Sequence, residues 1–276
     1  MSALEPRLPT LFLGHGSPIE AMGGRYADGW RRIGETLPRP RAVLMVSAHW
    51  YIDAVAVTAM KAPRTIHDFY GFPEELYAIE YPAPGEPWLA HRVAHLLAPV
   101  DVVQDQDWGL DHGTWSVLRH VFPDADVPVV QLAIDRTKPP AFHYELGRKL
   151  RDLRDEGVLI AGSGDVVHNL RAANFQSGDP PYDWAARFND FVRRAIQGDD
   201  RRVLIDYPAL GRDAQLSIPT PEHYLPLLYV LGASYDDETA SFFNDEIALK
   251  SISMLSVAIG HARPGGGGVV ESPPRG

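Results

Sequence analysis

Three histidines in this chain follow apolar runs that are typical of β-strands. His15 follows LFLG, His49 ends VLMVSAH, and His168 comes shortly after VLIAGSG. In open α/β sheets the ligand crevice lies beyond the carboxyl ends of the strands, so these imidazoles could converge on one site. Imidazole is the commonest metal ligand in proteins and the usual acid or base near neutral pH. The pattern therefore predicts a metal-dependent enzyme.

A fourth histidine, His223, lies beside a carboxylate in IPTPEHYLPLL. Thr220 is a suitable N-cap and Pro221 a suitable first helical residue, which places His223 in the first turn of a helix. Adjacent helical residues point about 100° apart, so either His223 or its neighbour Glu222 is expected to face a common centre. The residues alone leave both choices open, because many non-haem iron oxygenases use two histidines and one carboxylate.

Glycine-rich turns surround His15. Gly14 and Gly16 leave room for close approach of the backbone. The SPIE segment that follows, from Ser17 to Glu20, predicts a capping box that starts a helix.

Two other candidates also lie near glycines. His112, in GLDHGTW, could orient a substrate or bond to Asp111. The GSGD segment at 162–165, before His168, is expected to let the chain pass closely beneath a ligand. The remaining histidines fall in predicted helices or loops and are expected to be structural.

Composition limits the class of protein. The 276 residues carry a net charge of −10, which disfavours binding to nucleic acid or to an anionic membrane surface and favours small molecules. The absence of cysteine excludes disulfides and thiolate ligands and leaves nitrogen and oxygen donors for any metal. The N-terminal segment lacks a signal-peptide pattern and no apolar run approaches the length of a membrane span, so a cytoplasmic protein is expected.

Apolar β-branched runs alternate with helical patterns along the chain. This order predicts a single α/β domain whose mostly parallel or mixed sheet is covered by helices on both faces, with the metal site beyond the carboxyl ends of the strands. Strands are expected near 8–13, 42–48, 54–60, 100–105, 128–134 and 158–162, with two shorter elements within 239–259. Helices are expected near 18–36, 86–98, 114–121, 139–155, 182–197 and 221–232.

The segment 63–85 is rich in proline, glycine and aromatic residues. A loop of this length in a compact domain is often a lid or a binding wall. Tyr70, Phe72 and Tyr77 are therefore candidates for an apolar wall around a substrate, although they could equally pack only against the protein. The Gly- and Pro-rich tail, 264–276, has the composition of a disordered end and follows a domain of residues 1–263.

The motifs of several enzyme classes are missing. The chain has no Walker loop, no GxGxxG after a strand, no HExxH and no GxSxG. A zinc-dependent hydrolase remains an alternative, because imidazole binds zinc as well as iron.

Six segments taken together point to a known family. HGSP, SAHW, YGFPEELYAIEYPAPG, GLDHGTW, GSGDVVHNL and PTPEHYLPLL occur in order between Leu11 and Ala233 and resemble the 4,5-DOPA dioxygenase branch of the class III extradiol ring-cleavage dioxygenases. The resemblance implies that His15, His49 and His223 bind a divalent metal. It also implies that His168 is an acid/base or a fourth metal neighbour.

The same resemblance implies a reaction. A catechol would bind Fe(II), and O2 would then open its aromatic ring; Zn(II) could occupy the same site. His168 could accept a catechol proton and later return it, and His112 could hydrogen-bond the substrate or oxygen. A non-catalytic, Memo-type binding protein on the same fold is a further alternative.

Overall fold

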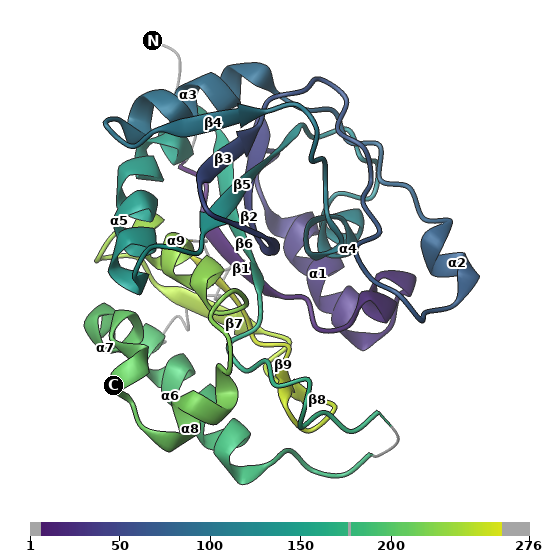
Figure 1. Cartoon of the computed structure of the whole chain (residues 1–276), viewed down its shortest axis with the longest axis vertical. Helices are drawn as coiled ribbons and strands as arrows, with labels where there is room; N and C mark the ends of the chain where they lie inside the picture. Colours follow the sequence, from purple (N-terminus) through teal and green to yellow (C-terminus); the bar gives the residue numbers. More distant parts are fainter. Residues whose placement is uncertain (1–6, 176–177, 261–276) are drawn as a thin grey trace, which may run out of the picture.

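A mixed β-sheet forms the centre of the molecule in the computed structural model, which describes residues 7–175 and 178–260 (Figure 1). Its strands are β1 (Thr10–Gly14), β2 (Ala42–Ile52), β3 (Val55–Thr58), β4 (Val102–Asp105), β5 (Val129–Asp135), β6 (Val158–Gly164), β7 (Ala240–Phe243) and β10 (Ser256–Ile259). Their order is β4-β3-β5-β2-β6-β1-β10-β7. A separate pair, β8 (Ile247–Ala248) and β9 (Ile252–Ser253), is antiparallel.

The centre of the sheet is parallel and its margins are mixed. β5, β2, β6 and β1 run parallel, whereas β10 and β7 continue the sheet antiparallel, and β3 meets β5 antiparallel. The continuous apolar runs in the sequence follow from this arrangement, because central parallel strands are buried on both faces. Their carboxyl ends lie together at one edge of the sheet.

Alternate residues of β2 pack into two different cores. Val43 and Met45 lie in a cluster with Trp30 of α1 (Arg25–Thr36) and Trp115 of α4 (His112–Val121). Leu44 and its even-numbered neighbours face the other side, because successive side chains of a strand point to opposite faces.

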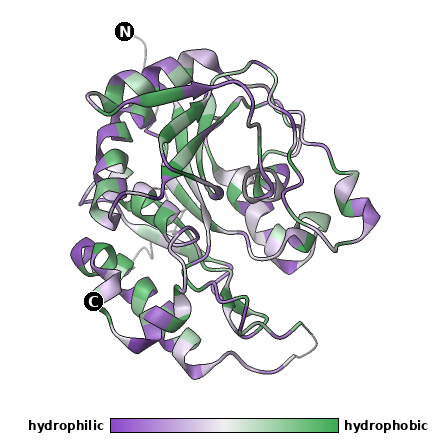
Figure 2. Ribbon diagram, viewed as in Figure 1, coloured by the Kyte–Doolittle hydropathy of each residue, from purple (hydrophilic) through white to green (hydrophobic). Residues whose placement is uncertain are grey.

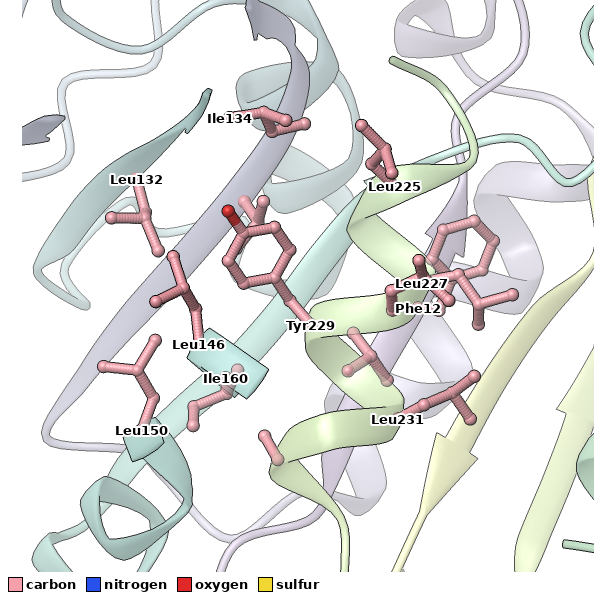
Figure 3. Close-up of a cluster of buried hydrophobic side chains, with 14 of the residues drawn as sticks. Phe12, Leu132, Ile134, Leu146, Leu150, Ile160, Leu225, Leu227, Tyr229 and Leu231 are labelled. Carbon is pink, nitrogen blue, oxygen red and sulfur yellow. The ribbon is translucent and has the colours of Figure 1, made fainter. Parts of the chain in front are cut away.

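The second core lies under three helices: α3 (Pro87–Leu97), α5 (Pro140–Leu150) and α9 (Leu225–Ala233). Figure 3 shows Leu146 of α5 beside Tyr229 of α9, with Leu150 of α5 and Ile160 of the sheet in the same cluster. Helix α9 is buried all round, so it is apolar on every side, whereas the outer helices carry hydrophilic residues away from the sheet (Figure 2). The predicted sheet with helices on both faces is confirmed.

A smaller helical group follows β6 in the chain. It consists of α6 (Asp183–Gln197), α7 (Arg201–Ile205), the 3-10 helix η3 (Tyr207–Ala209) and α8 (Arg212–Ser217). Of these, only α6 was expected from the sequence. No helix in the described ranges is long and apolar enough to cross a membrane.

The predicted helix over 18–36 is wrong in its first third. Residues Pro18–Met22 form a short 3-10 helix, η1, and Ser17 makes no side-chain cap, so the predicted capping box does not form. Gly23 and Gly24 then adopt φ values of 113° and 125°, which interrupt the helix before α1 begins.

Other boundaries also differ. The expected helix 139–155 begins as α5 and ends as the 3-10 helix η2 (Arg151–Glu156). The two short elements expected within 239–259 are four strands. The segment 63–85 contains the four-residue helix α2 (Glu74–Tyr77). The predicted tail, 264–276, lies outside the described residues.

An ion pair with a fully buried arginine joins the 3-10 helix η2 to the segment before β7. Arg154 is fully buried and donates from Nη2 and Nη1 to the two oxygens of Glu238, at 2.6 and 2.8 Å. Its Nε donates to the carbonyl oxygen of Leu8 at 2.7 Å. These bonds satisfy a charge that would otherwise be costly to bury.

Candidate active site

Five histidines meet at the carboxyl edge of the sheet and line one cavity of about 530 Å³. They are His15, His49, His112, His168 and His223. The ring centroids of His15, His49 and His223 lie 5.1 to 5.3 Å apart in each pair. The structure thus brings together all the histidines that the sequence singled out.

His15 is the first residue after β1 and is 1% exposed. Its backbone N–H donates to the carbonyl oxygen of Gly164 at 3.3 Å, and its Nδ1 lies 2.9 Å from Ser163 Oγ on the neighbouring strand β6. Burial, followed by the nearby imidazoles, lowers the pKa of His15 well below its usual value. The ring is therefore neutral, which is the form that binds a metal.

An irregularity in β2 positions His49. Between Val46 and Tyr51 the strand advances five residues while β5 advances two, from Leu132 to Ile134. Such a bulge turns side chains toward a site that a regular strand would not reach. The sequence placed His49 after the strand, whereas it lies in this interruption and β2 continues to Ile52.

The N-terminus of α4 packs closely on His49. A Cβ on Gly113 would lie 2.8 Å from His49 Cδ2 and 2.6 Å from Ser47 Oγ, so a larger residue would displace the imidazole. The Nδ1 of His49 lies 3.1 Å from Asp68 Oδ2. Burial acts to lower the pKa of His49, but Asp68 and the charge of Asp111 outweigh burial and raise it.

His223 lies in the turn before α9, not in the first helical turn as predicted. The helix begins at Leu225, and Pro226 rather than Pro221 occupies its first turn. The His223 Nδ1 lies 3.2 Å from Glu222 Oε1, which also accepts a hydrogen bond from Thr220. Glu222 therefore contacts the side of the imidazole that holds Nδ1.

The small residues of GSGD allow close packing between β6 and the segment that carries His223. A Cβ on Gly164 would lie 2.1 Å from the carbonyl oxygen of His223, and one on Gly162 would lie 2.7 Å from that of Pro226. These glycines let the segment carrying His223 pack directly on β6.

The three imidazoles share a pattern of partners. The Nδ1 atoms of His15, His49 and His223 lie 2.9, 3.1 and 3.2 Å from an oxygen of Ser163, Asp68 and Glu222, respectively. Metal-binding histidines almost always donate from one ring nitrogen in this way and present the other to the metal. The Nε2 atom of each ring is the donor that remains.

The spacing of these donors suits one ion. The Nε2 atoms of His15 and His49 lie 3.2 Å apart. Two nitrogens that bind one metal at about 2.1 Å, at angles of roughly 90–110°, lie about 3.0–3.4 Å apart. Donor atoms of His15, His49 and His112 also lie within 4.8 Å of one another, as do those of His15, Asp165 and His223. The residues present therefore fit a divalent metal.

His168 lies flat against His223. Their ring centroids are 3.4 Å apart and the planes differ by 6°. The backbone of His168 is fixed, because its N–H donates to the carbonyl oxygen of Ser217 and the residue bridges to Ile252. Burial lowers the pKa of His168 to about 4, so the ring is neutral near pH 7.

His112 is the first residue of α4 and contacts Asp68. Its backbone N–H donates to Asp68 Oδ1 at 2.8 Å, and its Nδ1 lies 3.0 Å from the same oxygen. The expected alternative, a bond to Asp111, does not form: that carboxylate accepts from Ser47 and from the backbone N–H of Thr114. Burial lowers the pKa of His112.

The segment 63–85, the aromatic loop, forms part of the cavity wall. Tyr70 and Phe72 line the cavity, and Tyr70 is 92% exposed. Tyr77 is not among the lining residues, and its ring packs against Phe69, with the centroids 5.0 Å apart. Phe69, which the sequence did not single out, faces the His112 ring edge-on at 5.5 Å.

Two groups of functional residues were missed. Leu170, Phe175 and Ile252 extend the apolar wall from distant parts of the chain. Asp68 and Asp165 are acids in contact with the histidines. Asp165 directly follows the strand β6 and precedes His168 by three residues, so its place at a strand end could have indicated a role in the site. No comparable sequence pattern marked Asp68.

Comparisons with known proteins identify the family. Residues 10–260 match the model described as the catalytic LigB subunit of aromatic ring-opening dioxygenase. A protein of Escherichia coli (strain K12) named 4,5-DOPA dioxygenase extradiol is 51% identical over 260 residues, which cover 92% of this chain and 95% of that protein. A Beta vulgaris protein of the same name is 35% identical over 249 residues, covering 86% of this chain and 90% of that one.

A solved structure agrees. The crystal structure of an uncharacterized protein from Escherichia coli K12 has a TM-score of 0.81 and 46% identity, and the match covers 92% of this chain and all of that one. The family implies a divalent metal, a small aromatic substrate and O2. The resemblance seen in the sequence is confirmed: the chain belongs to the aromatic ring-opening dioxygenases, extradiol oxidoreductases that incorporate O2 into aromatic substrates.

Proposed function

We propose that this protein is a non-haem Fe(II) extradiol dioxygenase that opens the ring of a DOPA-like catechol, with His15, His49 and His223 as the metal ligands. The observation that carries the proposal is the set of three Nδ1 atoms, each held by an oxygen, beside a cavity with an apolar wall. The names of the relatives support the substrate class. Glu222 then acts on the metal through His223.

The bound Fe(II) would supply the site that holds the catechol oxygens next to O2 and passes electrons between them. The remaining chemistry belongs to the chain. Neutral imidazoles leave the positive charge of the ion largely uncompensated, which favours an ionised catechol. The apolar wall excludes water from the ring to be opened and so protects reactive species from hydrolysis.

His168 carries the proton in this proposal. Its unprotonated ring nitrogen accepts the proton of a catechol hydroxyl and later returns this proton to an oxygen of the opened ring. His168 lies in the cavity, and the stack on His223 fixes its plane. His112, on the other side of His49, holds the substrate or O2 by a hydrogen bond; the His112 and His49 centroids are 3.8 Å apart.

The aromatic loop selects the substituent of the ring. None of the described residues that line the cavity is Lys or Arg, whereas Phe69, Phe72, Leu170 and Phe175 all are apolar. We expect Tyr70→Ala or Phe72→Ala to change the preference between catechols with small and large 4-substituents. Tyr77→Ala is the matched control, because Tyr77 lies in the same loop but does not line the cavity. Equal losses for all substrates that follow thermal stability would mean that the loop is structural.

The decisive experiment uses protein loaded with Fe(II) under anaerobic conditions. On mixing with O2 and a catechol, we expect O2 consumption and a yellow ring-opened product. Zn(II)-loaded protein should give neither, and it should be assayed in parallel on esters and peptides. Hydrolysis by the Zn(II) form without O2 uptake by the Fe(II) form would replace this proposal with a zinc-dependent hydrolase, and inactivity of both forms would favour a binding protein.

A further inference from the structure

Asp165 is a buried carboxylate of which only one oxygen has a hydrogen-bonding partner. The residue is 1% exposed and follows β6 directly. Its Oδ1 accepts the backbone N–H of Gly16 at 3.0 Å, and its own N–H donates to the carbonyl oxygen of His223 at 2.9 Å. Its Oδ2 has no hydrogen-bond partner among the described residues. The backbone on both sides of the histidine cluster therefore holds this carboxylate in place.

An oxygen in this state needs a partner. Burying a carboxylate is costly unless the group is paired, and unsatisfied buried polar atoms in native proteins commonly mark a bound water, an ion or a functional site. In the described part of the chain, the basic group found within ion-pair distance of Asp165 is the imidazole of His15, not an arginine or a lysine. That imidazole is itself a proposed metal ligand.

Asp165 Oδ2 lies close enough to the proposed metal ligands to share an ion with them. It lies 3.7 Å from His15 Nε2, and donor atoms of His15, Asp165 and His223 lie within 4.8 Å of one another. Two atoms that each bind one ion at about 2.1 Å can be at most about 4.2 Å apart, so 3.7 Å is within reach of a shared ion. Asp165 is not among the residues that line the cavity, so it approaches from the protein side and leaves the cavity side free for substrate.

We propose that Asp165 Oδ2 is a carboxylate donor to the divalent metal and that the site comprises three imidazoles and one carboxylate. The inference rests on the metal site of the proposed function but not on the reaction. One negative charge then compensates part of the charge of the ion. An oxygen donor also moves the preference of the site toward harder ions than three imidazoles alone would favour.

The test measures metal binding to Asp165→Asn. The amide keeps the shape of the side chain and can still accept the N–H of Gly16, but it removes the charge. Metal-free protein is titrated with Zn(II) and with Co(II) against a competing chelator. We expect affinity to fall about 10- to 100-fold or more, because even groups that only support metal ligands contribute that much. The visible spectrum of the Co(II) form should change as well.

Asp111→Asn is the matched control. Asp111 is also a fully buried acid near His49, but its Oδ1 accepts from Ser47 and its Oδ2 from Gln131. We expect its substitution to change metal affinity much less. An equal loss in both variants would mean that general negative charge, and not a contact with Asp165, supports the ion, and it would overturn the proposal.

Thermal unfolding separates a ligand from a structural residue. Metal-free Asp165→Asn should unfold at the same or a higher temperature than metal-free wild type, because an unpaired buried charge has been removed. The increase in Tm on adding Zn(II) should be smaller. A structural role predicts the reverse: a lower Tm without metal and unchanged affinity.

Asp165→Ser is a second variant that also removes the carboxylate. If neither variant folds without metal, Asp165 is structural and the proposal is wrong. None of these measurements uses a catechol. A protein that oxidises no catechol would contradict the proposed function and leave the result on Asp165 standing.

Discussion

Replacing Asp68 with alanine tests whether the acid in the aromatic loop controls the metal site. One carboxylate contacts two histidines: Oδ2 lies 3.1 Å from His49 Nδ1, and Oδ1 accepts the backbone N–H of His112 at 2.8 Å. Although burial acts to raise it, the two imidazoles hold the pKa of Asp68 well below its usual range, so the group is ionised. Without the Asp68 carboxylate, neither the orientation of the His49 ring nor the position of its proton is fixed.

The size of the effect follows from these contacts. Partners of metal-binding histidines typically contribute 10- to 100-fold to metal affinity, which is about 1.4–2.7 kcal/mol. We expect Asp68→Ala to fall in the upper half of this range, because both the loop and the start of α4 lose an anchor. Asp68→Asn should lose less, since an amide oxygen can still accept one of the two hydrogen bonds.

Metal affinity is measured by competition between metal-free protein and a Zn(II) chelator, together with thermal unfolding. Glu75→Gln is the control, because Glu75 is an exposed acid in the same loop. It should bind Zn(II) like the wild type. If Asp68→Ala binds Zn(II) as tightly as the control, the argument that Asp68 orients His49 is wrong.

Three other predictions concern proton transfer, pH and stability. His168→Ala should lower kcat by about 10²- to 10⁴-fold with less effect on KM and with metal content retained; loss of the metal would instead make His168 a ligand. Burial lowers the pKa of His143 to about 4. Between pH 6.5 and 4 the unfolded chain therefore binds a proton that the folded chain does not, so the free energy of unfolding decreases by up to about 3 kcal/mol as the pH is lowered. In metal-loaded protein, His143→Gln, which can still pair with Tyr229, should show a shallower decrease in unfolding free energy over this range, and a parallel decrease would contradict the assignment. Glu238→Ala should cost about 3–5 kcal/mol in denaturant unfolding because it leaves Arg154 buried without its counter-ion, whereas a loss below 1 kcal/mol would show that water reaches the guanidinium.

The sequence was sufficient to predict the convergence of the histidines because strand ends are local signals. A run such as VLIAGSG marks a buried strand, and parallel strands of one sheet must end at a common edge. The helix boundaries were less predictable. SPIE matches a capping box, but the Gly23–Gly24 pair, which begins three residues after Glu20, breaks the helix, and the glycine signal was the stronger of the two.

The position of His49 depends on the whole sheet. In a regular register His49 would lie opposite Asp135, the last residue of β5, but three extra residues relative to β5 form the bulge that carries the imidazole. The extra length has no distinctive composition in SAHWYI. Only pairing with β5, some 80 residues away in the chain, defines it, so no local pattern could have revealed it.

The partners of the three proposed ligands show how far local reasoning can reach. Glu222 adjoins His223 in the sequence, so its contact with Nδ1 could be anticipated as one of the two orientations. Ser163 is paired through β6 with Leu13, two residues before His15, so that partner follows once the parallel register is known. Asp68 can be assigned to His49 only after the aromatic loop has folded over the start of α4. The proposed metal site therefore needs the sheet, the turn before α9 and the loop all in place, and a change far from the metal in any of them is expected to reach it through an Nδ1 partner.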